Sequence, residues 1–290
     1  MSEFGVQTAL VRLLTDARLR RATLNGDLRP LTESGISTDD ALTVLKIDRD
    51  RLEIFADMIT AQRIDDLQNM LPITTRLLGT RLLEIEAAFR EEVVPRFSRR
   101  REYALAFGEY LREEFERKEP VPAFLMDVLN YEMNSLELFE RRNDPVPVSD
   151  AAKIEKIDDQ QSRFKIRIVR PSTNCTLRLK YDVLTAISQM RETDTFITPE
   201  QQPGFLLLHV NSSGSIEHDR INVATARFLE LCDGRNDLGT IISRLAAEYG
   251  VNDELAMRDF EAKCISLCKS LAARQIVYVV SDRLCTKSHE

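Results

Sequence analysis

Cys264 and Cys268 are the two residues whose spacing comes nearest to that of a chemical site. They lie one helical turn apart, so two thiolates on one helix face could bind a metal ion. No second cysteine pair accompanies them, and apolar residues continue the same helical stripe: Met257, Phe260, Leu267 and Leu271. This stripe predicts that both thiols belong to a hydrophobic core.

Other side chains that commonly do chemistry are sparse. The chain has three histidines, of which His209 and His218 fall on predicted strands and His289 falls in the tail. No zinc-peptidase, serine-hydrolase, phosphate-loop or dinucleotide-binding motif occurs. We therefore expect no catalytic residue, no metal site and no cofactor in this chain.

The net charge of −7 is unevenly distributed. Residues 1–150 hold 21 Lys and Arg against 28 Asp and Glu, whereas residues 151–290 hold 19 of each kind. Duplex DNA is bound mainly by neutralising its phosphates with a basic surface. We therefore expect no nucleic acid as a partner, and a winged-helix regulator that binds DNA is the alternative interpretation.

Length and composition predict about two domains with apolar cores. No run approaches the roughly 18 apolar residues of a membrane-spanning helix. The stretch Met1–Arg21 lacks the apolar segment of a signal peptide. Five widely spread cysteines favour reduced thiols. Together these features predict a cytoplasmic protein that does not contact a membrane.

Residues 1–142 show apolar residues at intervals of three and four, which predict a helical domain. Asp48 can cap a helix that ends before Pro72, and another helix is expected over Thr74–Phe97, with an interruption near Pro95. Residues 143–162 carry prolines and charges without an apolar stripe. This composition predicts a linker.

Residues 163–195 begin with two segments of alternating character, Arg163–Val169 and Cys175–Tyr181. Period two with a turn between the segments predicts a β-hairpin with one buried face. The other face would carry a basic stripe, which either keeps an edge strand from aggregating or docks an acidic partner. The stripe consists of Arg163, Lys165, Arg167, Arg178 and Lys180.

Residues 196–283 are expected to form a separate domain, followed by a tail over residues 284–290. Leu206–Val210 and Ser215–Ile221 read as two strands, and Asn211–Gly214 supplies the turn between them. The second strand alternates enough to be partly exposed.

A capped helix follows, because Asn222 is a suitable N-cap for Val223–Cys232, and two more helices come after Gly234, which suits a helix stop. This layout resembles the PqqD-type domain, the RiPP recognition element, whose pattern is LN…A…IL…L.DG. The matching residues are Ile221-Asn222, Ala226, Phe228-Leu229 and Leu231-Cys232-Asp233-Gly234. The resemblance implies a winged-helix-like domain in an α+β chain, and recognition of the leader of a ribosomal precursor peptide.

Two phrases in the helical region carry a second resemblance: Leu13–Asp16 with Leu19–Arg21, and Leu71–Gly79. They are similar to the N-terminal helical domain of partner proteins encoded beside multinuclear non-haem iron oxidases, as in the pathways to methanobactin and 3-thiaglutamate. The resemblance implies a non-catalytic partner that forms a heterodimer with the oxidase, in which the oxidase holds the iron. A scaffold for another class, such as a radical or ATP-dependent maturase, is a third interpretation.

In recognition elements of this type the leader adds a strand to an exposed sheet edge and lies against the last helix. Because donors alternate in direction along a strand, we expect one of Glu217 and Asp219 to point its N–H at the leader. The resemblance implies a peptide-binding site on the second strand and on a helix over Glu254–Arg274. Its residues are Ser215, Ile216, Glu217, His218, Asp219, Arg220, Ile221, Leu255, Phe260, Lys263 and Leu267.

Overall fold

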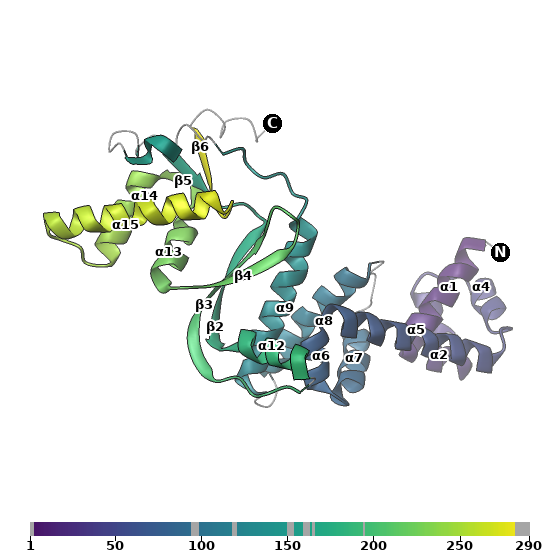
Figure 1. Cartoon of the computed structure of the whole chain (residues 1–290). Helices are drawn as coiled ribbons and strands as arrows, with labels where there is room; N and C mark the ends of the chain where they lie inside the picture. The colour runs from purple at the N-terminus through teal and green to yellow at the C-terminus, as the bar shows by residue number, and fades with distance from the viewer. Residues whose placement is uncertain are drawn as a thin grey trace. The chain divides into compact units, whose positions relative to one another are not determined.

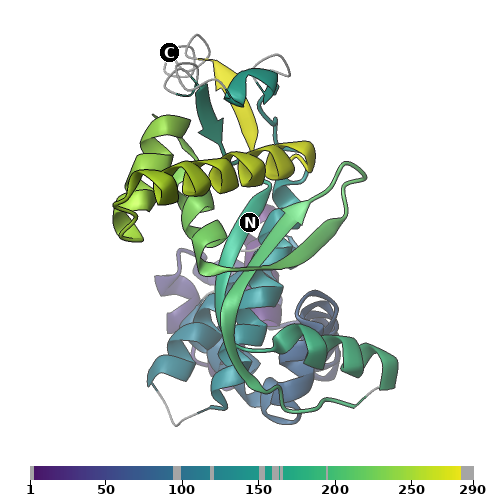
Figure 2. The same cartoon turned by 60° about the vertical axis from the view of Figure 1, so that its left-hand side comes forward.

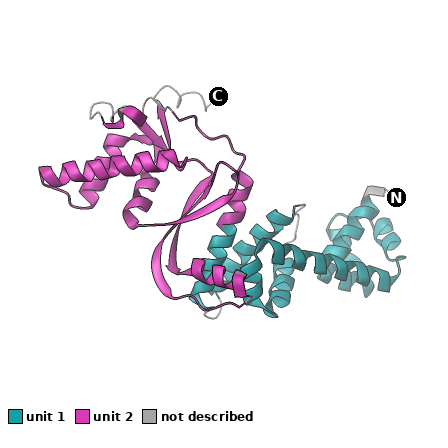
Figure 3. Cartoon of the chain, in the orientation of Figure 1, with its two compact units in different colours: residues 1–133 teal, residues 134–290 magenta. Residues whose placement is uncertain are grey.

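The structure is a computed structural model in which the chain forms two compact units, residues 1–133 and 134–290 (Figure 3). Unit 1 is helical, and unit 2 combines helices with two three-stranded antiparallel sheets. Mixed helix and sheet confirm the predicted α+β class. The described residues are 3–93, 99–117, 121–149, 154–158, 163, 166–193 and 195–281.

Capping side chains and a glycine with positive φ mark helix boundaries in unit 1. Asp48 accepts a hydrogen bond from the Arg51 N–H at 3.0 Å, which confirms the predicted cap. The helix expected from Thr74 is divided at Gly79, whose φ of 55° ends one helix before the next begins. The helices are α1 Glu3–Thr15, α2 Ala17–Leu24, α3 Arg29–Glu33, α4 Thr38–Val44, α5 Arg49–Met70, α6 Pro72–Leu78, α7 Arg81–Glu92 and α8 Arg100–Arg117; α9 Ala123–Arg141 crosses the boundary between the units.

Glu132 in α9 holds the start of α6. Its Oε1 accepts from the Ile73 N–H at 2.8 Å, and its Oε2 accepts from the Thr74 N–H at 2.9 Å. All three residues are buried, so the carboxylate replaces the water that these two helix-terminal donors would otherwise need. The phrase beginning at Leu71 thus has a structural function within this unit.

The described part of unit 2 contains two sheets with the strand orders β5-β1-β6 and β2-β3-β4. The strands are β1 Ile166–Val169, β2 Asn174–Tyr181, β3 Gln201–Val210, β4 Ile216–Ile221, β5 Asp233–Asp237 and β6 Tyr278–Ser281. The helices are the 3-10 turn η1 Lys156–Asp158, α12 Val183–Thr193, α13 Val223–Leu231, α14 Leu238–Glu248 and α15 Glu254–Ala273 (Figure 1).

The predicted hairpin of Arg163–Val169 with Cys175–Tyr181 is wrong. Both segments contain a strand, but β1 pairs with β5 and β6, whereas β2 pairs with β3. The Arg170 N–H donates to the Cys232 oxygen at 2.8 Å and so extends the β1–β5 pairing. The turn at Pro171 therefore carries the chain from one sheet to the other.

The core of unit 2 lies between the sheets and the last three helices. It contains Phe228 of α13, Leu238 of α14, Cys268 of α15 and Leu207 of β3. Ile157, inside the range expected to be a linker, is fully buried in the same core. This segment therefore contributes to the packing of unit 2.

The helix after β4 is capped as predicted, because the Asn222 side chain accepts from the Thr225 N–H at 2.8 Å. Gly234 has the left-handed φ of 76° that the sequence suggested. The residue lies in β5, three positions past the end of α13 at Leu231, so it turns the chain into a strand.

Candidate functional site

Strand β4 is one of the two outer strands of its sheet, as the described residues show it, and β2 is the other. It is antiparallel to β3, with Ile216 opposite Val210 and Ile221 opposite Phe205. Figure 2 shows the two strands as one long curved hairpin. In the described part of the chain β4 pairs only with β3, so one row of its backbone groups points away from the sheet.

Two hydrogen bonds establish the direction of the backbone groups. The Val210 N–H donates to the Thr173 oxygen at 3.0 Å, toward β2, and the Asn211 N–H donates to the Ser215 oxygen at 2.9 Å, toward β4. Since donors alternate along a strand, the odd-numbered residues of β3 and β4 exchange the hydrogen bonds between these strands.

The expectation for Glu217 and Asp219 is therefore wrong. They lie two residues apart, so their N–H groups point in the same direction, and that direction is toward β3. The N–H groups on the outer side of β4 belong to even-numbered residues, including Ile216 and Arg220. A strand added to this edge would be held at those positions.

Helix α15 meets β4 through a cluster of polar side chains. Arg274, the residue that caps the C-terminus of α15, donates from Nη2 to Asp219 Oδ2 at 2.5 Å. His209 Nε2 lies 3.1 Å from the same carboxylate oxygen and 3.3 Å from Arg274 Nη2. A carboxylate only accepts and a guanidinium only donates, so the proton on Nε2 determines which of the two contacts is a hydrogen bond.

His209 is a buried residue, with 4% of its side-chain surface exposed. It lies on the same face of the sheet as Asn174, which stands opposite it on β2 and donates to the Ile276 oxygen at 2.7 Å. Glu217 Oε2 is 3.7 Å from His209 Nε2. The face of the sheet that is turned toward α15 therefore carries a polar network at this end.

Three of the four predicted residues of α15 share the helix face of Arg274. Phe260, Lys263 and Leu267 precede it at intervals of three, four and seven residues, which are the intervals of one helix face. Leu255 lies five residues before Phe260, about 140° around the helix, and it is 77% exposed. Leu255 therefore lies on a different face of the helix from the other three.

The side chains on this face differ in what they offer. Phe260 and Leu267 are partly buried against the core, and the Phe260 ring centroid lies 6.4 Å from that of Tyr249. Lys263 is exposed and paired with Asp259 one turn earlier, at 2.6 Å. The face thus offers apolar surface with a charged rim, which suits a peptide with apolar anchors.

The predicted strand residues lie together along the edge. The Glu217 carboxylate accepts from the Asn211 amide at 2.6 Å, and the Arg220 guanidinium donates to Gln202 Oε1 at 2.8 Å. Ser215 and His218 are exposed, whereas Ile216 and Ile221 are partly buried.

The predicted basic stripe does not form a single hairpin face, because its two strands belong to different sheets. Arg163 precedes β1 and donates to the Glu261 carboxylate at 2.9 Å, and Lys165 lies outside the described residues. The other members are divided: Arg167 lies in β1, and Arg178 and Lys180 lie in β2.

The thiols of α15 belong to the core, as predicted. Burial raises the pKa of Cys264 to about 11 and that of Cys268 to about 12, and it raises the pKa of Cys232 well above its ordinary value. A protonated thiol is a poor nucleophile and a poor metal ligand. Within the described residues, no group of three potential metal ligands is assembled.

Arg274 was not among the residues predicted for the site. Its signal was present, since Phe260, Leu267 and Arg274 repeat every seven residues and therefore return to nearly the same helix face. The contact itself joins residues 55 positions apart, so no local pattern could identify Asp219 as its partner.

Comparison with known proteins gave no match to a family model and no match to a curated protein sequence. In the described ranges, no helix has the length and apolar character needed to cross a membrane.

Proposed function

We propose that this chain binds the leader of a ribosomally synthesised precursor peptide by strand addition to β4, beside the Arg274 face of α15. The observation that carries the proposal is the position of β4. It is an outer strand of a three-stranded sheet, and Arg274 at the end of the last long helix contacts it directly. Main-chain hydrogen bonds would give general affinity, and side-chain contacts would select the peptide.

The proposed partner of this subunit is a separate multinuclear iron oxidase, to which it presents the peptide, and the chain itself is non-catalytic. Support for this part comes from the second sequence resemblance, in the phrases around Leu13 and Leu71. The proposed PqqD-like character of residues 196–283 is supported by the antiparallel pair of β3 and β4, which is followed by the capped helix α13 and then by α14 and α15. We propose a cytoplasmic location for the complex.

Titration with short peptides encoded beside the gene tests the proposal. Each fluorescently labelled peptide would be titrated with the full chain, with and without the products of neighbouring oxidase genes. We expect one peptide to bind with a Kd of about 1 µM, since ordering a flexible segment offsets part of the contact energy. Absence of binding by every such peptide below about 100 µM would contradict the proposal, and salt-sensitive DNA binding in its place would favour a regulator.

A further inference from the structure

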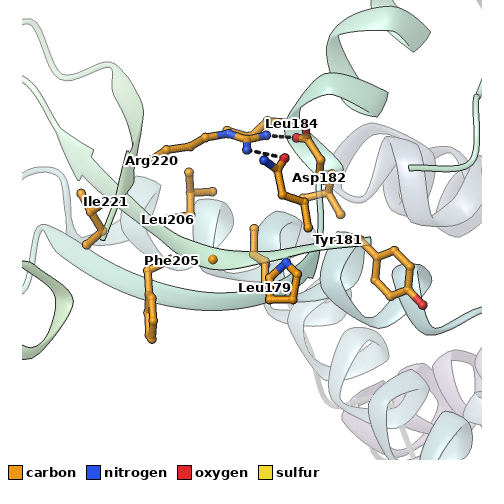
Figure 4. A pocket seen from close by; sticks show the side chains of 12 residues that line it. Leu179, Tyr181, Asp182, Leu184, Phe205, Leu206, Arg220 and Ile221 are labelled. Atoms are coloured by element: carbon orange, nitrogen blue, oxygen red, sulfur yellow. Dashed lines mark hydrogen bonds and ion pairs between the residues drawn. The ribbon is translucent and has the colours of Figure 1, made fainter. Parts of the chain in front are cut away.

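A cavity of about 180 Å³ lies at the end of β4, where β2 leads into α12. Figure 4 shows Arg220 reaching across it to Asp182, with Leu206 and Leu179 pointing to the same side and Phe205 pointing to the other. Pockets that bind small molecules usually have volumes of about 300–1,000 Å³, so this cavity is smaller than an ordinary small-molecule site. Its size suits a single side chain.

The cavity has apolar walls and a polar rim. Val183 and Leu206 are almost fully buried in its walls, and Leu184 is partly exposed beside them. Arg220 is bonded to both Asp182 and Gln202, so the charged groups at the rim are already paired. An apolar side chain could therefore enter without leaving a charge unpaired.

Asp182 is held in its ionised form at this rim. Burial acts to raise the pKa of its carboxyl, but hydrogen bonds from Thr185 and the ion pair with Arg220 outweigh burial and lower the pKa below its ordinary value. The Thr185 hydroxyl donates at 2.7 Å, at the first turn of α12. The rim is thus fixed to the helix that forms one wall.

The register of the sheet connects this cavity to the proposed peptide strand. Arg220 stands opposite Leu206, and both side chains lie on the cavity face, whereas Asp219 and Leu207 lie on the face toward α15. A strand added to β4 would alternate in the same way. Its side chain beside Arg220 would point to the cavity face, and the neighbours of that side chain would point toward α15.

We propose that the cavity is a subsite for one aliphatic or aromatic side chain of the peptide strand that pairs with β4. This inference rests on the proposed function and adds to it a second recognition surface, on the sheet face opposite α15. The recognised peptide then needs an apolar residue at the position beside Arg220, between two residues that face α15.

Gly204 offers a way to fill the cavity without disturbing the fold. It lines the cavity opposite Leu179, and a Cβ built on it would meet no atom within 4 Å. Its φ is not in the left-handed region, so Gly204→Val places two methyl groups toward the cavity from a strand that favours β-branched residues. Gln201→Val is the matched control, since Gln201 lies in the same strand but does not line the cavity.

The first arm of the test uses N-acetyl-L-leucine amide, with N-acetylglycine amide as the control, and the full chain with labelled methyl groups. We expect saturable NMR shifts of the Leu184 and Leu206 methyl groups at millimolar leucine amide, as is usual for so small a ligand. The shifts should disappear in Gly204→Val and persist in Gln201→Val. Absence of shifts in the wild-type chain, or equal shifts in Gly204→Val, would overturn the proposal.

The second arm uses the peptide that binds the wild-type chain. Gly204→Val should weaken its binding at least tenfold, while Gln201→Val leaves the affinity unchanged. Unchanged affinity in Gly204→Val would overturn the subsite and leave strand addition intact. If no peptide bound the wild-type chain, the proposed function would fall, and the peptide role of the cavity would fall with it even where the leucine amide still bound.

Discussion

Arg274, which follows the last residue of α15, donates from Nη2 to Asp219 Oδ2 in the edge strand β4 at a distance of 2.5 Å. The bond fixes the distance between the end of the helix and the edge of the sheet. Because His209 lies beneath it with only 4% of its side chain exposed, the pair also closes a buried polar network. The proposed peptide-binding edge of β4 is therefore held beside the end of α15.

Replacement of Arg274 by glutamine should affect peptide binding more than folding. The pair is partly exposed, so its loss should lower the free energy of unfolding by only about 0.2–1 kcal/mol in a urea titration. Peptide affinity should fall at least threefold, because the edge of β4 loses its fixed position beside the end of α15. Arg258→Gln is the control, since Arg258 forms a more exposed ion pair with Glu254 on another face of α15.

Glu132→Ala should destabilise the chain strongly. Two buried N–H groups at the start of α6 would lose a charged acceptor, and charge-assisted hydrogen bonds contribute about 1.5–3 kcal/mol each. We expect the free energy of unfolding, measured by urea titration, to fall by roughly 3 kcal/mol. Glu137→Ala, in the exposed part of the same helix, should change the free energy by less than about 0.5 kcal/mol. Equal effects of the two variants would contradict the capping role of Glu132.

Buried thiols should make the chain unstable in alkali. The folded pKa of Cys268, about 12, is raised above the ordinary value of 9.0, so the unfolded chain loses this proton first as the pH rises. Below pH 9 the buried thiol contributes its full stabilisation. Between pH 9 and about 12 this contribution is lost, and the free energy of unfolding falls by up to about 1.4 kcal/mol per pH unit. Cys268→Ala should therefore show a shallower decline than the wild-type chain over this interval. The difference between the free energies of unfolding of the two proteins at pH 7 serves as the baseline. Parallel plots of these free energies against pH would contradict the prediction.

Proline substitutions should separate the two sides of β4. The Ile216 N–H points outward and the Glu217 N–H points to β3, so Ile216→Pro removes a donor for the peptide and Glu217→Pro removes one from the sheet. Ile216→Pro should weaken peptide binding at least tenfold with a small change in melting temperature. Glu217→Pro should lower the melting temperature. The opposite pattern would mean that the strand is not used as its register indicates.

Features that depend on a few neighbouring residues were predictable from the sequence. The caps at Asp48 and Asn222 each require only a side chain and an N–H three residues later, and both form. Strand pairing is different. β1 and β2 have the same alternating pattern, and the pattern does not encode which strand each one pairs with.

The actual partners of β1 explain why the hairpin prediction failed. β5 consists of Asp233–Asp237, a glycine-containing polar segment that strand propensities disfavour. β6 lies more than 100 residues after β1 in the chain. The bond from Arg220 to Asp182 likewise joins distant segments. The edge strand could be predicted, whereas the cavity beside it required the register and α12.

Hydrogen exchange of individual β4 amides tests strand addition most directly. Exchange rates of Ile216 and Arg220 would be measured by NMR in the full chain, with and without saturating peptide. Strand addition predicts that both amides exchange at least tenfold more slowly in the complex, because each gains a backbone acceptor, while the exposed loop amide of Asn252 is unchanged. Unchanged rates at Ile216 and Arg220 with the peptide fully bound would contradict strand addition to β4.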